Sequence, residues 1–306
     1  MSKNSERIRS KKSIQAGWNG YAYAGNVPPR GLLINGRPAM TQINPEEAGD
    51  FVLLTVRDPL CAYDADPAEL LAARLENVKL IGRSGMFTSY TGMYKGAKIT
   101  IVSGGSGSGE AEMALYDFME YTDAHTYLRV GGSGGLGDDV RPGDIVIASG
   151  VVREDGMTGA YIPPAYPAIC HYEVVLAMVQ AAERLDIPYH VGVTLSVASD
   201  FVGGGRPGVG GYLQPWNMDI PAVYNRAGVL NGDRESAGIV TLASIFGLRG
   251  GAVCSVADNL ITGEKFREGA GHGDAIEVAL NACAILQQMD AEKKGKRYWY
   301  PELKGR

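Results

Sequence analysis

Short apolar runs alternate with longer amphipathic runs along most of this chain. Each short run is rich in β-branched residues and is bounded by Gly, Pro or Asp, a pattern that predicts buried strands. The predicted strands are Phe51–Val56, Lys98–Val102, Thr126–Val130, Asp144–Ala148, Tyr189–Thr194 and Ala252–Val256. The longer runs carry apolar residues at spacings of three and four, which predicts helices with one buried face. The predicted helices are Pro67–Glu76, Glu110–Thr122, Tyr172–Leu185, Glu235–Phe246 and Asp274–Met289.

Strands that alternate with covering helices predict an α/β fold, here a three-layer α/β/α arrangement around a central mixed, largely parallel sheet. No linker interrupts the alternation, so we expect residues 46–306 to form a single catalytic domain. Residues 1–45 precede it as an N-terminal extension that we expect to be partly disordered, because it begins with a polar, basic stretch. Ligands of such sheets bind beyond the carboxyl ends of the strands, and we expect the functional site there.

Composition narrows the classes of function. The chain of 306 residues is 45% hydrophobic, which is enough for a full core, and its formal net charge of −5 argues against nucleic acid as a main partner. The apolar runs are too short to span a bilayer and the N-terminus lacks the apolar core of a signal peptide, so we expect a cytoplasmic protein with no membrane partner. The cysteines and histidines show no metal-ligand spacing, and we predict no metal site.

The segment Thr126–Leu136 carries one arginine into a run of glycines. Glycines around Ser133 would let backbone N–H groups approach an oxyanion, and the fork-shaped guanidinium of Arg129 can bind a phosphate through two parallel hydrogen bonds. The segment therefore predicts an anion-binding cradle at a strand end. A glycine-rich turn with a surface arginine is an equally good interpretation of these residues alone.

Two other glycine-rich segments stand near predicted strands. Residues 203–211 are compatible with a mobile lid over a site and equally with a flexible surface loop. Val102–Glu110 superficially resembles a phosphate loop, but it lacks the lysine of a nucleotide triphosphate loop and the acidic residue that follows a dinucleotide fingerprint. It gives little support to an ATP or dinucleotide site.

Several short motifs occur in an order that resembles one enzyme family. They are Arg57-Asp58-Pro59, Thr91–Gly96, the Arg129 segment, Gly192-Val193-Thr194, Asp233–Ala237 and Val256-Ala257-Asp258. Over roughly residues 45–290 the chain resembles the nucleoside phosphorylase family that contains uridine phosphorylase and the hexameric purine nucleoside phosphorylases. Residues 151–194 are most similar to uridine phosphorylase, whereas Asp258 resembles the purine branch. The resemblance implies a nucleoside phosphorylase-like fold.

The resemblance also implies an activity, phosphorolysis, in which inorganic phosphate attacks the anomeric carbon of a purine or pyrimidine nucleoside and releases the free base and a pentose 1-phosphate. It implies Asp258, Arg129 and Glu235 as catalytic residues; Arg129, Ser133, Arg83 and Arg57 as phosphate-binding; Glu235 and Arg234 as ribose-binding; and Gly134, Phe201, Arg206 and Asp258 as base-binding. No cofactor is implied beyond phosphate as co-substrate. A homo-oligomer is implied, a dimer-based trimer or hexamer whose active sites are shared, with Arg83 supplied by a neighbouring subunit.

The chemistry of the reaction supports the three catalytic roles independently. Breaking a glycosidic bond builds positive charge on the sugar and negative charge on the departing base, so the site needs an anionic nucleophile, a carboxylate at the sugar and a proton donor. Arg129, Glu235 and Asp258 supply these functions. Taken alone, Glu235 is better explained as a first-turn helix carboxylate and Asp258 as a turn-forming residue, and only the other motifs favour the catalytic roles.

The chain departs from the family pattern at the phosphate and sugar positions. Arg57 stands at a family glycine and Cys61 at a phosphate-binding arginine, so Arg57 either restores the lost contact or fills the space that phosphate needs. Glu110 adds a carboxylate that would repel phosphate. Arg234 replaces an apolar sugar contact, which is explained either by an acidic or phosphorylated substrate or by a surface ion pair.

Two other functions are left open by these departures. A nucleosidase, in which water replaces phosphate, fits the loss at Cys61, whereas the retention of Arg129 and Arg83 argues against it. A non-catalytic homologue would bind a nucleoside without turnover, but it needs fewer groups than this chain carries. A nucleoside phosphorylase, a pentosyltransferase, is therefore our main prediction.

Overall fold

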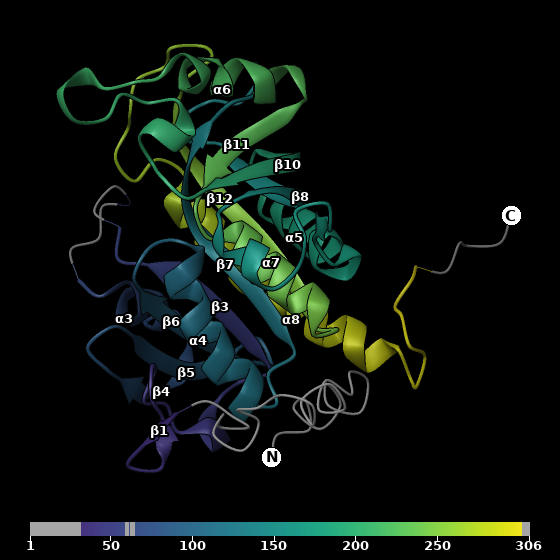
Figure 1. The fold of residues 1–306 in the computed structure, drawn as a ribbon. Helices are drawn as coiled ribbons and strands as arrows, with labels where there is room; N and C mark the ends of the chain where they lie inside the picture. Colours follow the sequence, from purple (N-terminus) through teal and green to yellow (C-terminus); the bar gives the residue numbers. More distant parts are fainter. Residues whose placement is uncertain (1–31, 59–60, 62–64, 302–306) are drawn as a thin grey trace, which may run out of the picture.

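The computed structural model describes residues 32–58, 61 and 65–301. Most of the predicted N-terminal extension, residues 1–31, lies outside the described residues. Strands β1 (Leu33–Ile34) and β2 (Arg37–Pro38) form a small hairpin, and the other strands of the described part form one mixed sheet with helices on both faces (Figure 1). The α/β class and the mixed central sheet that the sequence predicts are confirmed.

The sheet is built from strands that are mostly parallel at its centre. They are β3 (Phe51–Val56), β4 (Glu76–Arg83), β5 (Thr88–Tyr94), β6 (Ala97–Gly104), β7 (Thr126–Gly135), β8 (Ile145–Glu154), β9 (Ala168–Ile169), β10 (Tyr189–Val197), β11 (Val229–Asp233) and β12 (Arg249–Asn259). The order is β11-β10-β8-β12-β7-β3-β6-β5-β4, with β9 beside β8. Strand β11 also pairs antiparallel with β7, so the sheet curls and closes five of its strands into a ring.

Helices cover the sheet on two sides. They are α3 (Pro67–Ala72), α4 (Ser108–Tyr121), α5 (Tyr172–Leu185), α6 (Pro215–Arg226), α7 (Ser236–Ile245) and α8 (His272–Glu292). Side chains alternate along β7, so Leu128 and Val130 pack with α3, α5 and α8, while Tyr127 packs with α4 and α7 on the opposite face. None of the helices in the described part is both long enough and apolar enough to cross a membrane.

The strand β7 differs from its prediction in a way that matters for function. The sequence predicts that the strand ends at Val130 and gives way to glycines, but β7 continues through the glycines to Gly135. Parallel pairing with β12 continues along this run, with Gly131 opposite Cys254 and Ser133 opposite Val256. Because ladder hydrogen bonds use only backbone groups, the glycines extend the strand instead of breaking it. The predicted turn is wrong.

Candidate functional site

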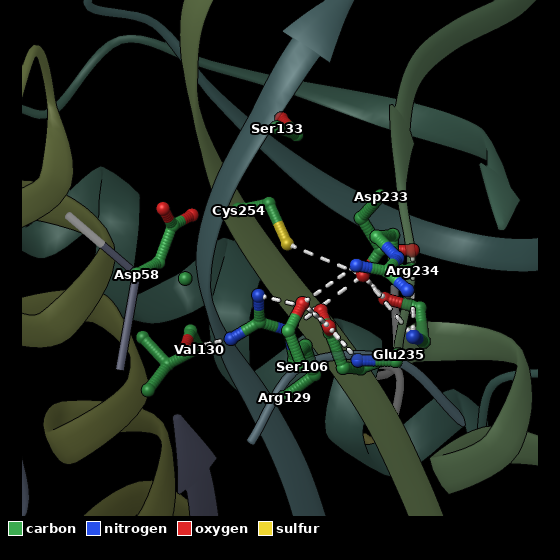
Figure 2. Close-up of polar contacts among 12 residues, drawn as sticks. Asp58, Ser106, Arg129, Val130, Ser133, Asp233, Arg234, Glu235 and Cys254 are labelled. Atoms are coloured by element: carbon green, nitrogen blue, oxygen red, sulfur yellow. Dashed lines mark hydrogen bonds and ion pairs between the residues drawn. The ribbon is translucent and has the colours of Figure 1, made fainter. Parts of the chain in front are cut away.

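The guanidinium of Arg129 lies at the centre of a buried charged group. Alternation along β7 points this side chain to the α4 and α7 face, where it is buried. Its Nη2 lies 2.8 Å from Oε2 of Glu235, its Nε lies 3.6 Å from Oδ2 of Asp233, and its Nη1 donates to the carbonyl of Val130 (Figure 2). A Cβ at Gly131 would come within 2.0 Å of Nη1, so only glycine at this position lets the guanidinium fold back against the strand.

The two carboxylates reach Arg129 from one short segment. Strand β11 ends at Asp233, and Glu235 immediately precedes α7, so the chain delivers both acids at the start of that helix. Asp233 also accepts hydrogen bonds from the backbone N–H and hydroxyl of Ser236. A cavity beside this segment is lined by Arg129 and Glu235 together with apolar and backbone groups of β3, β6 and α4.

The glycine-rich loop between β6 and α4 supports the Glu235 carboxylate. Oε1 of Glu235 accepts a hydrogen bond from the hydroxyl of Ser106 at 3.0 Å and another from the backbone N–H of Gly107 (Figure 2). Helix α4 begins one residue later, at Ser108. The loop that superficially resembles a phosphate loop therefore donates one backbone N–H and one hydroxyl to a protein carboxylate in this structure.

Burial and charge together set the ionisation of this group. Burial of Asp233, followed by the nearby Glu235 charge, raises the pKa of the Asp233 carboxyl. Burial disfavours the charge on Arg129, but Glu235 and the other neighbouring acidic groups outweigh it and raise the pKa of the guanidinium. Burial also raises the pKa of the Cys61 thiol to about 11, so this thiol is neutral near pH 7. One buried cation thus faces two carboxyl groups.

A second group lies further along β7. The Nη2 of Arg206 donates to both oxygens of Asp258, at 2.9 and 2.7 Å. Gly134 lies directly beneath this ion pair, because a Cβ there would come within 3.0 Å of Asp258 Oδ1 and 3.2 Å of Arg206 Nη2. Three of the four predicted base-binding residues are therefore in one place. Gly134 is five residues beyond Arg129, which corresponds to about 16 Å of strand.

Arg234 connects the surroundings of the Glu235 carboxylate to the segment that follows β10. Its Nη1 lies 3.1 Å from Oδ2 of Asp200 and 3.3 Å from the hydroxyl of Ser106, which itself donates to Glu235. Its Nη2 donates to the carbonyl of Ala198. The predicted ribose-binding pair, Glu235 and Arg234, thus shares Ser106.

Four predicted site residues have side chains that make no contact with the two groups. The Ser133 hydroxyl donates to the carbonyl of Ser255 and accepts from Asn231, away from the Arg129 contacts (Figure 2). Arg57 donates to Asp66, Thr88 and the carbonyl of Met86. Arg83 is exposed on β4, where it donates to Tyr90, and Phe201 is 63% exposed. Their ligand-binding roles stay predictions.

Ser106, Asp233 and Asp200 are site residues that the sequence assignment omits. Asp233 stands two positions before Glu235, and that spacing at a helix start is a usable signal. Ser106 and Asp200 carry no local signal, because their contacts with Glu235 and Arg234 depend on chain segments far apart in sequence. Within residues 32–58, 61 and 65–301 no cluster of His, Cys, Asp and Glu could hold a metal ion.

Comparison with known proteins gives a consistent family. Residues 60–289 match the family model described as the phosphorylase superfamily. Over 221 residues the chain is 38% identical to a uridine phosphorylase from Thermococcus kodakarensis, covering 72% of this chain and 79% of that relative. A guanosine phosphorylase from Halorubrum lacusprofundi is 29% identical over 235 residues, covering 73% and 91%. A uridine phosphorylase from Treponema pallidum is 27% identical over 241 residues, covering 74% and 89%.

Proposed function

Because the chain belongs to the phosphorylase superfamily, we propose that it cleaves the N-glycosidic bond of a nucleoside with inorganic phosphate, releasing the free base and a pentose 1-phosphate. The observation that carries this proposal is the buried contact of Arg129 with Glu235, at 2.8 Å, beside one cavity. It brings together a group suited to an oxyanion and a group suited to sugar hydroxyls from segments more than one hundred residues apart.

The roles follow from the charges that develop in the reaction. The guanidinium of Arg129 binds phosphate and directs it at the anomeric carbon, while the Glu235 carboxylate accepts hydrogen bonds from the sugar hydroxyls and offsets positive charge on the ring. We assign the base to Asp258 and Arg206, which form an ion pair beside Gly134 of β7. Donors held in place toward the charge on the leaving base contribute on the order of 10²–10³ in rate. Phosphate is the only co-substrate required.

The Arg206–Asp258 ion pair supports a preference for oxo bases. It presents an N–H donor beside a carboxylate acceptor, which matches a base edge that has a carbonyl oxygen beside a ring N–H. Uracil and guanine both have such an edge, and the relatives include proteins named for uridine and for guanosine. We therefore place uridine and guanosine first among candidate substrates, ahead of adenosine and cytidine.

The test is base release from these four nucleosides with and without phosphate. Phosphorolysis requires release that depends on phosphate and yields a pentose 1-phosphate, and Arg206→Ala, which removes the N–H donor to the base, should lower it by about 10²–10³-fold. Equal rates in phosphate-free buffer would instead identify a hydrolase. Binding without turnover of any of the four would overturn the enzymatic proposal.

An oligomer with shared sites is part of the proposal. Strand β4 is the edge of the sheet, and its apolar side chains Val78 and Leu80 are 43% and 45% exposed, which fits contact with another subunit. Arg83 lies on the same strand and is exposed. A second copy packed on this edge would carry Arg83 toward a neighbouring site, as the family resemblance implies.

Mixing two inactive variants tests the shared site. Arg83→Ala and Glu235→Gln should each be impaired alone, and subunit exchange between them should restore activity, because some sites then contain intact copies of both residues. Recovery would be absent if each site used its own Arg83. Sedimentation velocity of the wild-type protein gives the oligomer size, and a monomer would contradict the proposal.

A further inference from the structure

One arginine fixes the direction of a hydrogen bond beside the Glu235 carboxylate. Nη1 of Arg234 lies 3.3 Å from the hydroxyl oxygen of Ser106, and that oxygen lies 3.0 Å from Oε1 of Glu235 (Figure 2). A guanidinium can only donate hydrogen bonds, and a carboxylate can only accept them. The Ser106 hydroxyl has a single proton, so it accepts from Arg234 and directs that proton to Glu235.

The direction of this hydrogen bond determines which carboxylate oxygen the protein holds. Oε1 of Glu235 accepts from Ser106 and from the backbone N–H of Gly107. Each carboxylate oxygen has about two lone-pair positions, so these two donors fill those of Oε1. The carboxylate is thereby anchored through Oε1 to the loop between β6 and α4. Oε2, which Arg129 contacts, is left as the oxygen that can accept from a ligand.

Arg234 is itself held from two sides. Its Nη1 lies 3.1 Å from Oδ2 of Asp200, and its Nη2 donates to the carbonyl of Ala198 at 3.3 Å. Its own backbone carbonyl accepts a hydrogen bond from the hydroxyl of Ser108, the first residue of α4. Because these partners come from the segment after β10 and from α4, they keep the guanidinium beside Ser106.

Gly107 leaves space for this guanidinium. A Cβ at this position would come within 3.2 Å of Nη2 of Arg234, and the φ angle of 97° lies in the region that favours glycine. The N–H of the same residue donates to Glu235. The loop can therefore contact the carboxylate and the arginine at once.

We infer that Arg234 is a positioning residue for sugar recognition, because it orients the Ser106 hydroxyl toward Glu235 and so holds that carboxylate for the sugar hydroxyls. The inference rests on the proposed function, in which Glu235 binds the sugar. Hydrogen bonds that lock a ligand-binding side chain determine how precisely it meets the ligand. An acidic or phosphorylated substrate is not needed to explain this arginine, since Asp200 already balances its charge.

Discrimination between a ribonucleoside and its 2′-deoxy counterpart measures this positioning. Uridine and guanosine are each compared with their 2′-deoxy forms in the presence of phosphate, and the ratio of the two kcat/KM values is taken. Contacts with the base and with phosphate are common to both substrates and cancel in the ratio. We expect a wild-type ratio of about 10- to 150-fold, the contribution of one hydrogen bond to a charged group. A wild-type ratio near one overturns the inference.

Single variants then test the two donors. Arg234→Met removes the guanidinium, Ser106→Ala removes the hydroxyl, and each should lower the ratio by about 10-fold. Ser106→Thr retains the hydroxyl at an exposed position and should keep the ratio. Arg74→Met, which breaks an exposed pair with Glu277, is the matched control and should also keep it. A general loss of stability lowers both rates equally, so an unchanged ratio in Arg234→Met overturns the inference.

A double variant tests whether Arg234 acts through Ser106. If it does, the protein with both Ser106→Ala and Arg234→Met has the same ratio as Ser106→Ala alone, because the proton to be directed is already absent. Multiplied effects would mean that Arg234 contacts the substrate itself, and they overturn the inference. A wild-type preference for nucleoside 5′-monophosphates that Arg234→Met abolishes would do the same.

The Ser106 variant decides the matter even if Arg234→Met does not fold, which circular dichroism establishes, because an unchanged ratio in Ser106→Ala also overturns the inference. Failure of the proposed function has a different signature, namely base release that does not need phosphate, and the ratio can still be measured there. Phosphate-dependent release with a ratio that neither variant changes removes this inference alone. No release from any of these nucleosides overturns both.

Discussion

Two buried arginines on neighbouring strands of the sheet have opposite surroundings. Arg249 begins β12 and donates through all three of its nitrogens, to Thr126, His125, Glu173 and Asp290. Lys293 adds a second cation that binds both of these carboxylates. Arg129 faces Glu235 and Asp233 without a second cation in contact, and its Nε has no hydrogen-bond partner among the described residues.

The difference indicates that the group around Arg249 stabilises the fold, whereas the group around Arg129 is a candidate for ligand binding. Around Arg249 two cations balance two carboxylates, and every guanidinium nitrogen is satisfied, as expected of a structural ion-pair network. Around Arg129 the charges do not balance and hydrogen-bonding capacity remains. Groups whose surroundings shift their pKa and leave them incompletely satisfied are candidates for function.

Removal of Arg249 should have the largest effect on stability. Arg249→Ala leaves the buried Glu173 carboxylate and the partly exposed Asp290 carboxylate with one cation fewer, which lowers the free energy of unfolding by about 3–5 kcal/mol. Urea denaturation measures this loss. Arg74→Ala, which breaks an exposed pair with Glu277, is the control and should change stability by about 0–1 kcal/mol. Similar losses in the two variants would contradict the structural role of Arg249.

Removal of Arg129 should act on the reaction. Arg129→Ala is expected to lower kcat/KM by about 10²–10³-fold, because it removes the donor that we propose binds phosphate. Steady-state kinetics with varied phosphate measures kcat/KM for this variant. The kcat/KM of folded Arg249→Ala protein is the comparison. The comparison fails if the folded Arg249 variant loses as much activity as the Arg129 variant.

The stability contributed by the Arg249 group and by the Arg129 group should change with pH in opposite directions. Burial works against the charges of Glu173 and Asp290, but hydrogen bonds from Lys293 and Arg249 outweigh it and hold the pKa of both carboxyls below their ordinary values of 4.5 and 3.8. Their stabilising contribution is therefore present above about pH 4.5 and is lost as the pH falls through the lowered values. The pKa of Asp233 is raised from 3.8, so its contribution is greatest below that pH and is lost as the pH rises.

Isosteric variants separate these contributions. Asp290→Asn should weaken the gain in stability with rising pH, whereas Asp233→Asn should remove a loss of stability over the range above pH 3.8. Denaturation midpoints between pH 3 and 8 measure both. Changes of the same sign in the two variants would show that the groups do not differ in this way.

The smallest effect is expected at Arg57. Its side chain is 40% exposed and pairs with Asp66 at 3.0 Å, so Arg57→Ala should change stability by no more than about 1 kcal/mol. Its charge is already shared with Asp66, and the KM for phosphate should rise less than in Arg129→Ala. A larger rise in KM would make Arg57, and not Arg129, the main phosphate ligand.

Buried strands and amphipathic helices were the parts of the fold that the sequence could predict. Phe51–Val56 and Tyr172–Leu185 are found with the predicted bounds. Strand β4 could not be predicted from apolar pattern, because most of its positions are exposed. Helix α6 could not be predicted because Pro221 lies inside it and none of its residues is fully buried, although Ile220 and Tyr224 pack against the core.

The individual site residues were more predictable than their mutual contacts. Arg129 and Glu235 follow from short motifs, but their pairing depends on how β7 and the start of α7 lie in the folded sheet. Arg206 and Asp258 were both assigned to the base, yet their ion pair depends on an irregular glycine-rich segment whose path no periodicity describes. Register and loop path are set by tertiary packing, which local sequence does not encode.

Strand β12 has a consequence for how the protein fails on heating. This one strand of 11 residues begins at Arg249, in the ion-pair network, and reaches Asp258, which we propose contacts the base. Because one strand carries both residues, we expect loosening of the ion-pair network to disturb the proposed site as well. Thermal inactivation should therefore coincide with cooperative melting, with no temperature range in which an intact protein has lost its activity.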